Sequence, residues 1–322
     1  MTTAPQARFG ITIPFEGVSL QDHQRWFHEL VELGYTDVWS GEVDGNDGFT
    51  PLALAAAWAP TLNLGVAIAP VFTRGPALLA QTAASIAEAA PGRFALGIGA
   101  SSEVIVERWN SMVYADPYYR VRDTVRFLHA AFAGEKVDFE SPRLSVKGFR
   151  LARVPETPPK IYLAALRPGM LALAGRETDG AILNWLSATD VEKAVAEIGP
   201  GKEVVARIFV CPTEDAELAR SVGRRMITAY LNVEGYAEFH RWLGRGPQLE
   251  AMWAAWAAGD RKGALAAIPN EVVDELIVHG SLAECRAHVA RYVAHGVTVP
   301  MPALVLAGGD LGEAVRGLAP NQ

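Results

Sequence analysis

One pattern recurs eight times along this chain: a short apolar run, a loop containing Gly, Pro or Asp, and then a segment with helical periodicity. Such alternation predicts βαβ units and therefore a parallel sheet. The runs are apolar on both faces, as expected where helices cover both sides. Eight units predict an α/β fold, the (β/α)8 TIM barrel, with an open doubly wound sheet as the alternative. The predicted strands are 9–13, 36–40, 62–68, 94–98, 161–165, 180–183, 204–210 and 297–306.

Two segments interrupt the repeat. Residues 136–159, rich in Pro and Gly, predict a hairpin after the helix that follows strand four. Residues 213–275 predict a long helical insertion after strand seven. On a barrel such an insertion walls or covers the site, while a dimer contact or plain packing is an equal alternative. No linker-like stretch divides the chain, so residues 1–322 are predicted to form a single domain.

Composition narrows the function classes. No run approaches the roughly 18–20 apolar residues of a spanning helix, and the N-terminus lacks the apolar stretch of a signal peptide. Two distant cysteines, Cys211 and Cys285, exclude a disulfide framework and fit a reducing, cytoplasmic location. The net charge of −7 comes without a Lys/Arg cluster. Nucleic acids and anionic membranes are therefore not expected as partners.

The loops after the strands are where a barrel builds its active site. All seven histidines are predicted in helices or at helix ends, none directly after a strand, and His-x-His and Cys-x-x-Cys spacings are absent. We therefore expect no catalytic metal. A Gly-x-Ser-x-Gly elbow and a phosphate-binding Walker loop are missing too. The histidines are His23, His28, His129, His240, His279, His288 and His295.

Acidic residues do follow two strands. Glu42, Asp44 and Asp47 come after strand two, and Glu103 and Glu107 after strand four. A pair of carboxylates across the barrel mouth is the arrangement that glycoside hydrolysis needs. Loop acids are, however, more often solvated or used to cap helices.

Two further loops have the composition of anion sites. Residues 97–102 (GIGASS) leave strand four toward a helix, and residues 166–170 (LRPGM) leave strand five with Arg167 and a proline near a helix start. Free N–H groups at a positive helix end bind phosphate, and Arg167 adds charge.

Four segments in order, 64–76 (LGVAIAPVFTRGP), 92–109 (GRFALGIGASSEVIVERW), 117–125 (PYYRVRDTV) and 161–185 (IYLAALRPGMLALAGRETDGAILNW), resemble the luciferase-like monooxygenase superfamily, specifically its coenzyme F420-dependent branch. The resemblance covers nearly the whole chain. It implies an oxidoreductase that transfers a hydride between bound F420, a deazaflavin, and a small organic substrate, commonly as a homodimer. An FMN-dependent monooxygenase is the alternative; the lack of His after any strand favours F420.

The resemblance also implies where the cofactor lies. A bulge in strand three carries a non-prolyl cis peptide behind the ring, and the matching bond is Ala67–Ile68, with a one-residue uncertainty in register. Glu42 matches the acid that contacts the polar edge of the ring. The loops after strands four and five match regions that hold the tail and phosphate. The implied cofactor-binding residues are Glu42, Ala67, Ile68, Ala69, Gly99, Ala100, Ser101, Ser102, Leu166, Arg167, Gly169 and Met170.

Two departures bear on the substrate. Some sugar-phosphate dehydrogenases of this branch carry Asp-His after strand two, where this chain has Glu42–Val43. Their Gly-Gly-Pro after strand five is Leu-Arg-Pro here, at 166–168. A sugar-phosphate substrate is therefore in doubt, and the catalytic His is missing. Glu42 and Glu103 are the first candidates for acid–base work, with the alternatives Asp44, Glu107 and Tyr114 left open.

Aromatic residues near strand ends suggest an apolar substrate pocket, although each of them is also explained by core packing. They are Phe15, Trp39, Phe49, Phe72, Trp109 and Trp185.

Overall fold

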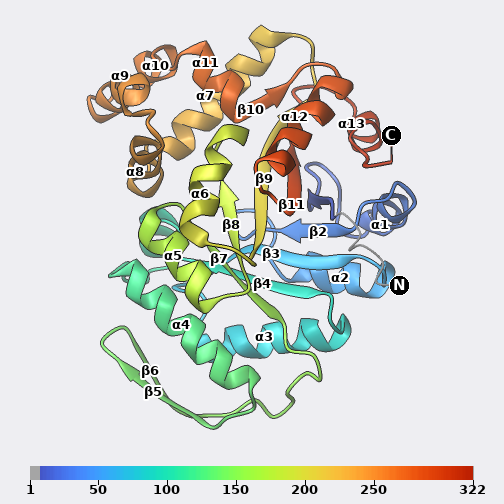
Figure 1. The fold of residues 1–322 in the computed structure, drawn as a ribbon, viewed down its shortest axis with the longest axis vertical. Helices are drawn as coiled ribbons and strands as arrows, with labels where there is room; N and C mark the ends of the chain where they lie inside the picture. Colours follow the sequence, from blue (N-terminus) through green and yellow to red (C-terminus); the bar gives the residue numbers. More distant parts are fainter. Residues whose placement is uncertain (1–7, 322) are drawn as a thin grey trace.

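The computed structural model describes residues 8–321, in which the eight predicted strands form a nearly closed parallel barrel (Figure 1). Neighbouring strands pair in parallel around the sheet, and the last strand pairs with β9 and lies against β1. The first and last strands therefore meet, which confirms the barrel. The strands are β1 (Gly10–Thr12), β2 (Asp37–Ser40), β3 (Asn63–Pro70), β4 (Phe94–Gly99), β7 (Lys160–Ala164), β8 (Gly180–Asn184), β9 (Glu203–Cys211) and β11 (Val299–Leu304).

Helices surround the barrel and bury their apolar faces against it (Figure 1). Three of them begin at a proline, whose fixed φ and missing N–H suit the first turn. None of the described helices is long and apolar enough to cross a membrane. These outer helices are α1 (His23–Glu32), α2 (Thr50–Trp58), α3 (Pro76–Ala89), α4 (Pro117–Phe132), α5 (Pro168–Glu177), α6 (Val191–Ile198), α12 (Leu282–Ala294) and α13 (Leu311–Gly317).

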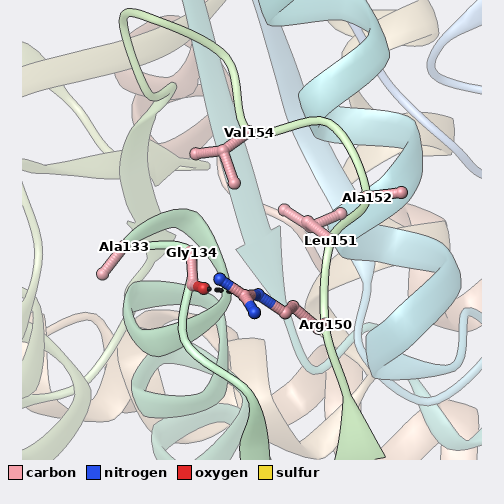
Figure 2. Close-up of a pocket in the computed structure, with 6 residues that line it drawn as sticks. All are labelled: Ala133, Gly134, Arg150, Leu151, Ala152 and Val154. Atoms are coloured by element: carbon pink, nitrogen blue, oxygen red, sulfur yellow. Dashed lines mark hydrogen bonds between the residues drawn. The ribbon is translucent and has the colours of Figure 1, made fainter.

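The first insertion is the predicted hairpin. Strands β5 (Val137–Ser141) and β6 (Leu144–Phe149) pair antiparallel beyond the end of α4. A hollow of about 480 Å³ lies where the chain returns from this hairpin toward β7 (Figure 2). There Arg150 Nε donates to the carbonyl of Gly134 at 3.1 Å. Because α4 runs back from the end of β4, this hollow lies at the amino-terminal end of the barrel, away from the strand ends that form barrel active sites.

The second insertion is the predicted helical stretch, and Figure 1 shows it gathered at one end of the molecule. It also contains a strand that the sequence pattern did not predict, β10, which pairs with the last residues of β9 outside the barrel. The prediction that every histidine lies in a helix or at its end is wrong for His279, which ends β10. Three residues are too few for a strand periodicity to show. The elements are α7 (Ala216–Leu231), α8 (Glu234–Leu243), α9 (Gly246–Ala257), α10 (Arg261–Ala266), α11 (Asn270–Leu276) and β10 (Ile277–His279).

Large side chains fill the interior of the barrel beneath its mouth. Trp39 of β2 and Tyr162 of β7 are fully buried there with ring centroids 5.9 Å apart. Glycine on the neighbouring strand makes the space: a Cβ on Gly65 would lie 2.2 Å from the Trp39 ring. Trp39 is thus barrel core rather than pocket lining. Trp109, by contrast, is 53% exposed and belongs to no core.

Candidate active site

The end of β3 forms an apolar shelf at the barrel mouth. The register with β4 shifts between Val66 and Ala69, and the Ala67–Ile68 peptide bond is cis, as the resemblance implies. Ala67 and Ile68 are half-buried, whereas their neighbours on both sides are buried. The bulge therefore presents these two side chains to the mouth.

Small residues on the adjoining strands keep the shelf open. Gly99 ends β4, and a Cβ there would lie 3.0 Å from Cβ of Ala164 on β7 and 3.3 Å from Cδ1 of Ile68. Three adjacent strands thus meet in an apolar surface that a larger residue at 99 would occupy. Such a surface suits one face of a planar ring.

Glu42, beyond the end of β2, is held in an ion pair. Arg74 Nε lies 3.0 Å from both carboxylate oxygens of Glu42, and both side chains are about four-fifths buried. The Arg74 guanidinium also lies over the ring of Phe49, 4.6 Å from its centroid. Glu42 is therefore a fixed hydrogen-bond acceptor beside a cation. The sequence segment 64–76 contains Arg74, but nothing in the pattern pairs it with an acid 32 residues away.

Asp47 takes the helix-capping role that was the alternative for the acids of this loop. Its Oδ1 accepts from the backbone N–H groups of Phe49 at 2.9 Å and Thr50 at 3.0 Å, where α2 starts. Burial alone would raise the pKa of Asp47, but the hydrogen bonds from Thr50 and Phe49 and the charge of Arg74 prevail and lower it. Asp44 is exposed.

The loops after β4 and β7 come together around Tyr114. The Tyr114 hydroxyl donates to the carbonyl of Ser101 at 3.3 Å. Burial raises the pKa of Tyr114; the nearby charge of Arg167 opposes that rise and the charge of Glu103 adds to it. The predicted residues Ser101, Glu103 and Arg167 therefore lie close enough to act on one hydroxyl.

Arg167 is exposed and directly precedes α5, and among residues 8–321 it forms no ion pair. Pro168 has no N–H and the Met170 amide donates to the Arg167 carbonyl at 3.0 Å, so the amide of Gly169 is the donor that this turn offers to an anion beside the charge of Arg167. Gly169 is exposed, with open space where a Cβ would stand. Ala100, Leu166 and Met170 are half-buried and pack on the core, and Ser102 is half-buried beside them.

On the opposite side of the mouth, sequence reasoning named Trp185 but missed the polar residues next to it. Asn184 ends β8, and Arg207 pairs with it in register on β9. The Asn184 amide donates to the hydroxyl of Tyr236 on α8 at 2.9 Å, so the helical insertion covers this part of the rim. The signal was available: Arg207 interrupts an otherwise apolar strand, residues 204–210.

The histidine that binds the loop after β1 has a structural role. His23 is buried on α1, where its Nε2 accepts from the backbone N–H of Phe15, just after β1, at 2.8 Å. Its Nδ1 lies 2.7 Å from the Ser19 carbonyl. Burial lowers the pKa of His23, so the ring is neutral and structural. His279 pairs with Asp274 at 3.0 Å, and no group of metal-binding side chains occurs in the described part of the chain.

A family model described as luciferase-like monooxygenase matches residues 6–299. The chain belongs to the luciferase-like monooxygenase family. A 5,10-methylenetetrahydromethanopterin reductase of Methanolobus tindarius is 26% identical over 298 residues, 87% of this chain and 88% of the relative. An F420-dependent glucose-6-phosphate dehydrogenase of Rhodococcus hoagii is 29% identical over 210 residues, 60% of this chain and 56% of the relative.

The fold is shared with solved structures as well. The coenzyme F420-dependent tetrahydromethanopterin reductase of Methanopyrus kandleri superposes with a TM-score of 0.77, at 17% identity, over 98% of each chain. Family membership and the barrel architecture, both expected from the sequence, are thereby confirmed.

Proposed function

We propose that this protein is a coenzyme F420-dependent oxidoreductase that transfers a hydride between the deazaflavin and a small organic substrate. The observation that carries the proposal is the apolar shelf at Ala67 and Ile68, with the Glu42–Arg74 ion pair on one side and the exposed Arg167 at the start of α5 on the other. Relatives named for F420 support the choice of cofactor.

The residues on the rim suit each part of such a molecule. Ala67, Ile68 and Ala69 would support one face of the ring, with the space left by Gly99 alongside. The Glu42–Arg74 pair supplies both an acceptor and donors for the polar edge of the ring. Arg167 and the amide of Gly169 at the start of α5 would hold the phosphate, with Ser101 and Ser102 along the tail.

When bound, the deazaflavin supplies or accepts the hydride. The chain's part is to orient the reactants, exclude water and provide a proton. Tyr114 carries its proton at neutral pH, as tyrosines ordinarily do, and burial raises its pKa further. Glu103 beside it is exposed to solvent. Glu42 is fixed by Arg74, which suits hydrogen bonding to the ring more than proton transfer.

Titration of the purified protein with F420 and with FMN, followed by ring fluorescence, tests the proposal. We expect F420 to bind at least tenfold more tightly. Tighter FMN binding with oxygen-dependent turnover would support the monooxygenase alternative, which shares the family and the fold. The two alternatives share a fold but differ in cofactor, so the relative affinity for F420 and FMN decides between the oxidoreductase and the monooxygenase.

Two further expectations stay predictions. We propose that the enzyme works as a homodimer, which light scattering coupled to gel filtration measures. We also propose a cytoplasmic location, which suits two cysteines that are buried and unpaired.

A further inference from the structure

Arg207 lies inside the barrel and, within residues 8–321, its side chain has neither a hydrogen-bond nor an ion-pair partner. The alternation along β9 places it on the same face as Val205, which belongs to the barrel-interior cluster. Its register partners are Asn184 on β8 and Met301 on β11, and Met301 is interior too. Among the residues that the structure describes, its guanidinium makes no ion pair, and its buried Nε has no hydrogen-bond partner.

Other polar atoms around Arg207 are unpaired as well. Within residues 8–321, Oδ1 of Asn184 and Nε1 of Trp185 are buried without a partner. The Tyr236 hydroxyl accepts from Asn184, which leaves its own proton to be donated. Buried polar groups are nearly always hydrogen-bonded, so several orphans in one place at a barrel mouth indicate a ligand. Donors outnumber acceptors in this set, and one of them is a cation.

Aromatic rings wall the same place. The Arg207 guanidinium lies over the Phe209 ring, 4.9 Å from its centroid, and the Trp185 ring is 4.3 Å from that of Phe209. The ring of Tyr230 on α7 belongs to the same cluster, with its centroid 5.1 Å from that of Trp185. A guanidinium on an aromatic face keeps its fork of donors fixed. The site thus combines one fixed cation with an apolar, aromatic surround.

Resting on the proposed function, we propose that the substrate is a carboxylate with an apolar or aromatic body, and that Arg207 binds its carboxylate. Trp185 and Phe209 are buried beside Arg207 and form the apolar wall of the site. A planar carboxylate matches the fork of a single Arg. The positive charge of Arg207 balances the single negative charge of the carboxylate. A phosphate dianion in the same half-buried place would keep an uncompensated charge, which is costly. The side of the mouth formed by β8 and β9 is then the substrate side, opposite the arc from β2 to β7 proposed for the cofactor.

Benzoate and its neutral counterpart benzamide are the probes. Trp185 contacts the site, so binding is followed by tryptophan fluorescence and by the melting temperature, with and without F420. We expect saturable benzoate binding, at least tenfold tighter than benzamide and tighter than phenyl phosphate. Equal binding of benzoate and benzamide overturns the proposal, and tighter phenyl phosphate binding overturns the carboxylate assignment.

Arg207→Met should remove the preference for benzoate, and Arg207→Lys should retain part of it. Arg225→Met, on the outer side of α7, is the matched control and should leave the preference unchanged. A benzoate affinity unchanged in Arg207→Met overturns the proposal. So does a tenfold loss of F420 affinity in that variant, because Arg207 would then serve the cofactor.

F420 titration of the same preparations separates the two claims. If F420 binds and benzoate shows no preference, the substrate inference fails while the proposed function stands. If benzoate binding depends on Arg207 while F420 does not bind, the oxidoreductase proposal fails while the carboxylate site is supported.

Discussion

Arg167 and Glu42 both follow a barrel strand, yet their electrostatic surroundings are opposite. Glu42 is neutralised by Arg74 at 3.0 Å, whereas Arg167 has no counter-charge within residues 8–321. An exposed cation without a partner at a helix start is available to a ligand, while a paired acid is already oriented. The two residues therefore call for different measurements, an affinity for Arg167 and a rate for Glu42.

Arg167→Ala should weaken F420 binding roughly tenfold or more, because a charge-assisted hydrogen bond contributes about 1.5–3 kcal/mol. The effect should shrink at high salt as the phosphate is screened. Fluorescence titration at two ionic strengths measures it, with Arg225→Ala as the control for lost surface charge. A dissociation constant unchanged at both ionic strengths contradicts a role in phosphate binding.

Glu42→Gln should slow single-turnover reduction of the bound cofactor and moderately weaken its binding, since the amide accepts less strongly and Arg74 loses its counter-charge. Asp260→Ala is the matched control from the helical insertion. Asp260 caps α10, where its Oδ1 accepts from the N–H of Gly263 at 2.8 Å, so its removal should cost about 0.5–2 kcal/mol of unfolding free energy and leave the hydride-transfer rate unchanged. The reverse pattern, with Glu42 affecting only stability, would remove it from the site.

The sequence predicts residues that act within one loop better than residues that act through contacts between strands. Arg167 and Gly169 could be proposed from the sequence because a loop between a strand and a helix start is visible there, and their role stays a prediction. The Glu42–Arg74 pair joins the ends of two strands, and Arg207 gains significance only from its lack of a partner within residues 8–321. Those facts depend on barrel closure, which periodicity does not encode.

At the scale of elements, the sequence predicted the eight barrel strands and both insertions because apolar runs and turn residues are local signals. The short β10 was missed, and the helix expected after residues 97–102 is the π-helical turn Val104–Trp109, a type that the sequence did not predict. Each element is too short for a period to emerge. Contacts between elements, unlike the elements themselves, depend on single residues. The contact between β3 and β4 next to the apolar shelf is an example.

Gly97→Ala should destabilise the protein by about 1–3 kcal/mol, because a Cβ there would lie 2.0 Å from the backbone carbonyl of Val66, which a side-chain rotation cannot relieve. Since Val66 directly precedes the shelf, F420 affinity should fall as well. Gly235→Ala in α8 is the control: nothing lies within 4 Å of its Cβ position, and Ala favours helix. Urea unfolding of both variants checks the difference; equal stabilities would contradict the close β3–β4 packing.

At the amino-terminal end of the barrel, a network of ion pairs and hydrogen bonds connects three of its strands. Arg8 binds Asp37 at the start of β2 and Glu203 at the start of β9, and Lys160 and the hydroxyl of Tyr162, both on β7, also donate to Glu203. Three strands that are distant in sequence are thus tied together opposite the candidate site. On barrels this end contributes stability, while the strand carboxyl ends carry function.

The pH dependence of stability should reveal this network. Burial acts to raise the pKa of Glu203, but hydrogen bonds from Lys160 and Tyr162 and the charge of Arg8 outweigh it, so the pKa lies below the usual 4.5. A lowered folded-state pKa gives stability that is fully present above the unfolded value and is lost as the pH falls through the folded one. Glu203→Gln should therefore cost about 1–3 kcal/mol at pH 7, and the gap to wild type should narrow below about pH 4. Chemical unfolding from pH 3 to 8 measures the gap, with F420 affinity at pH 7 unchanged because the network lies at the far end of the barrel. A gap that stays constant with pH would mean that Glu203 acts through packing rather than charge.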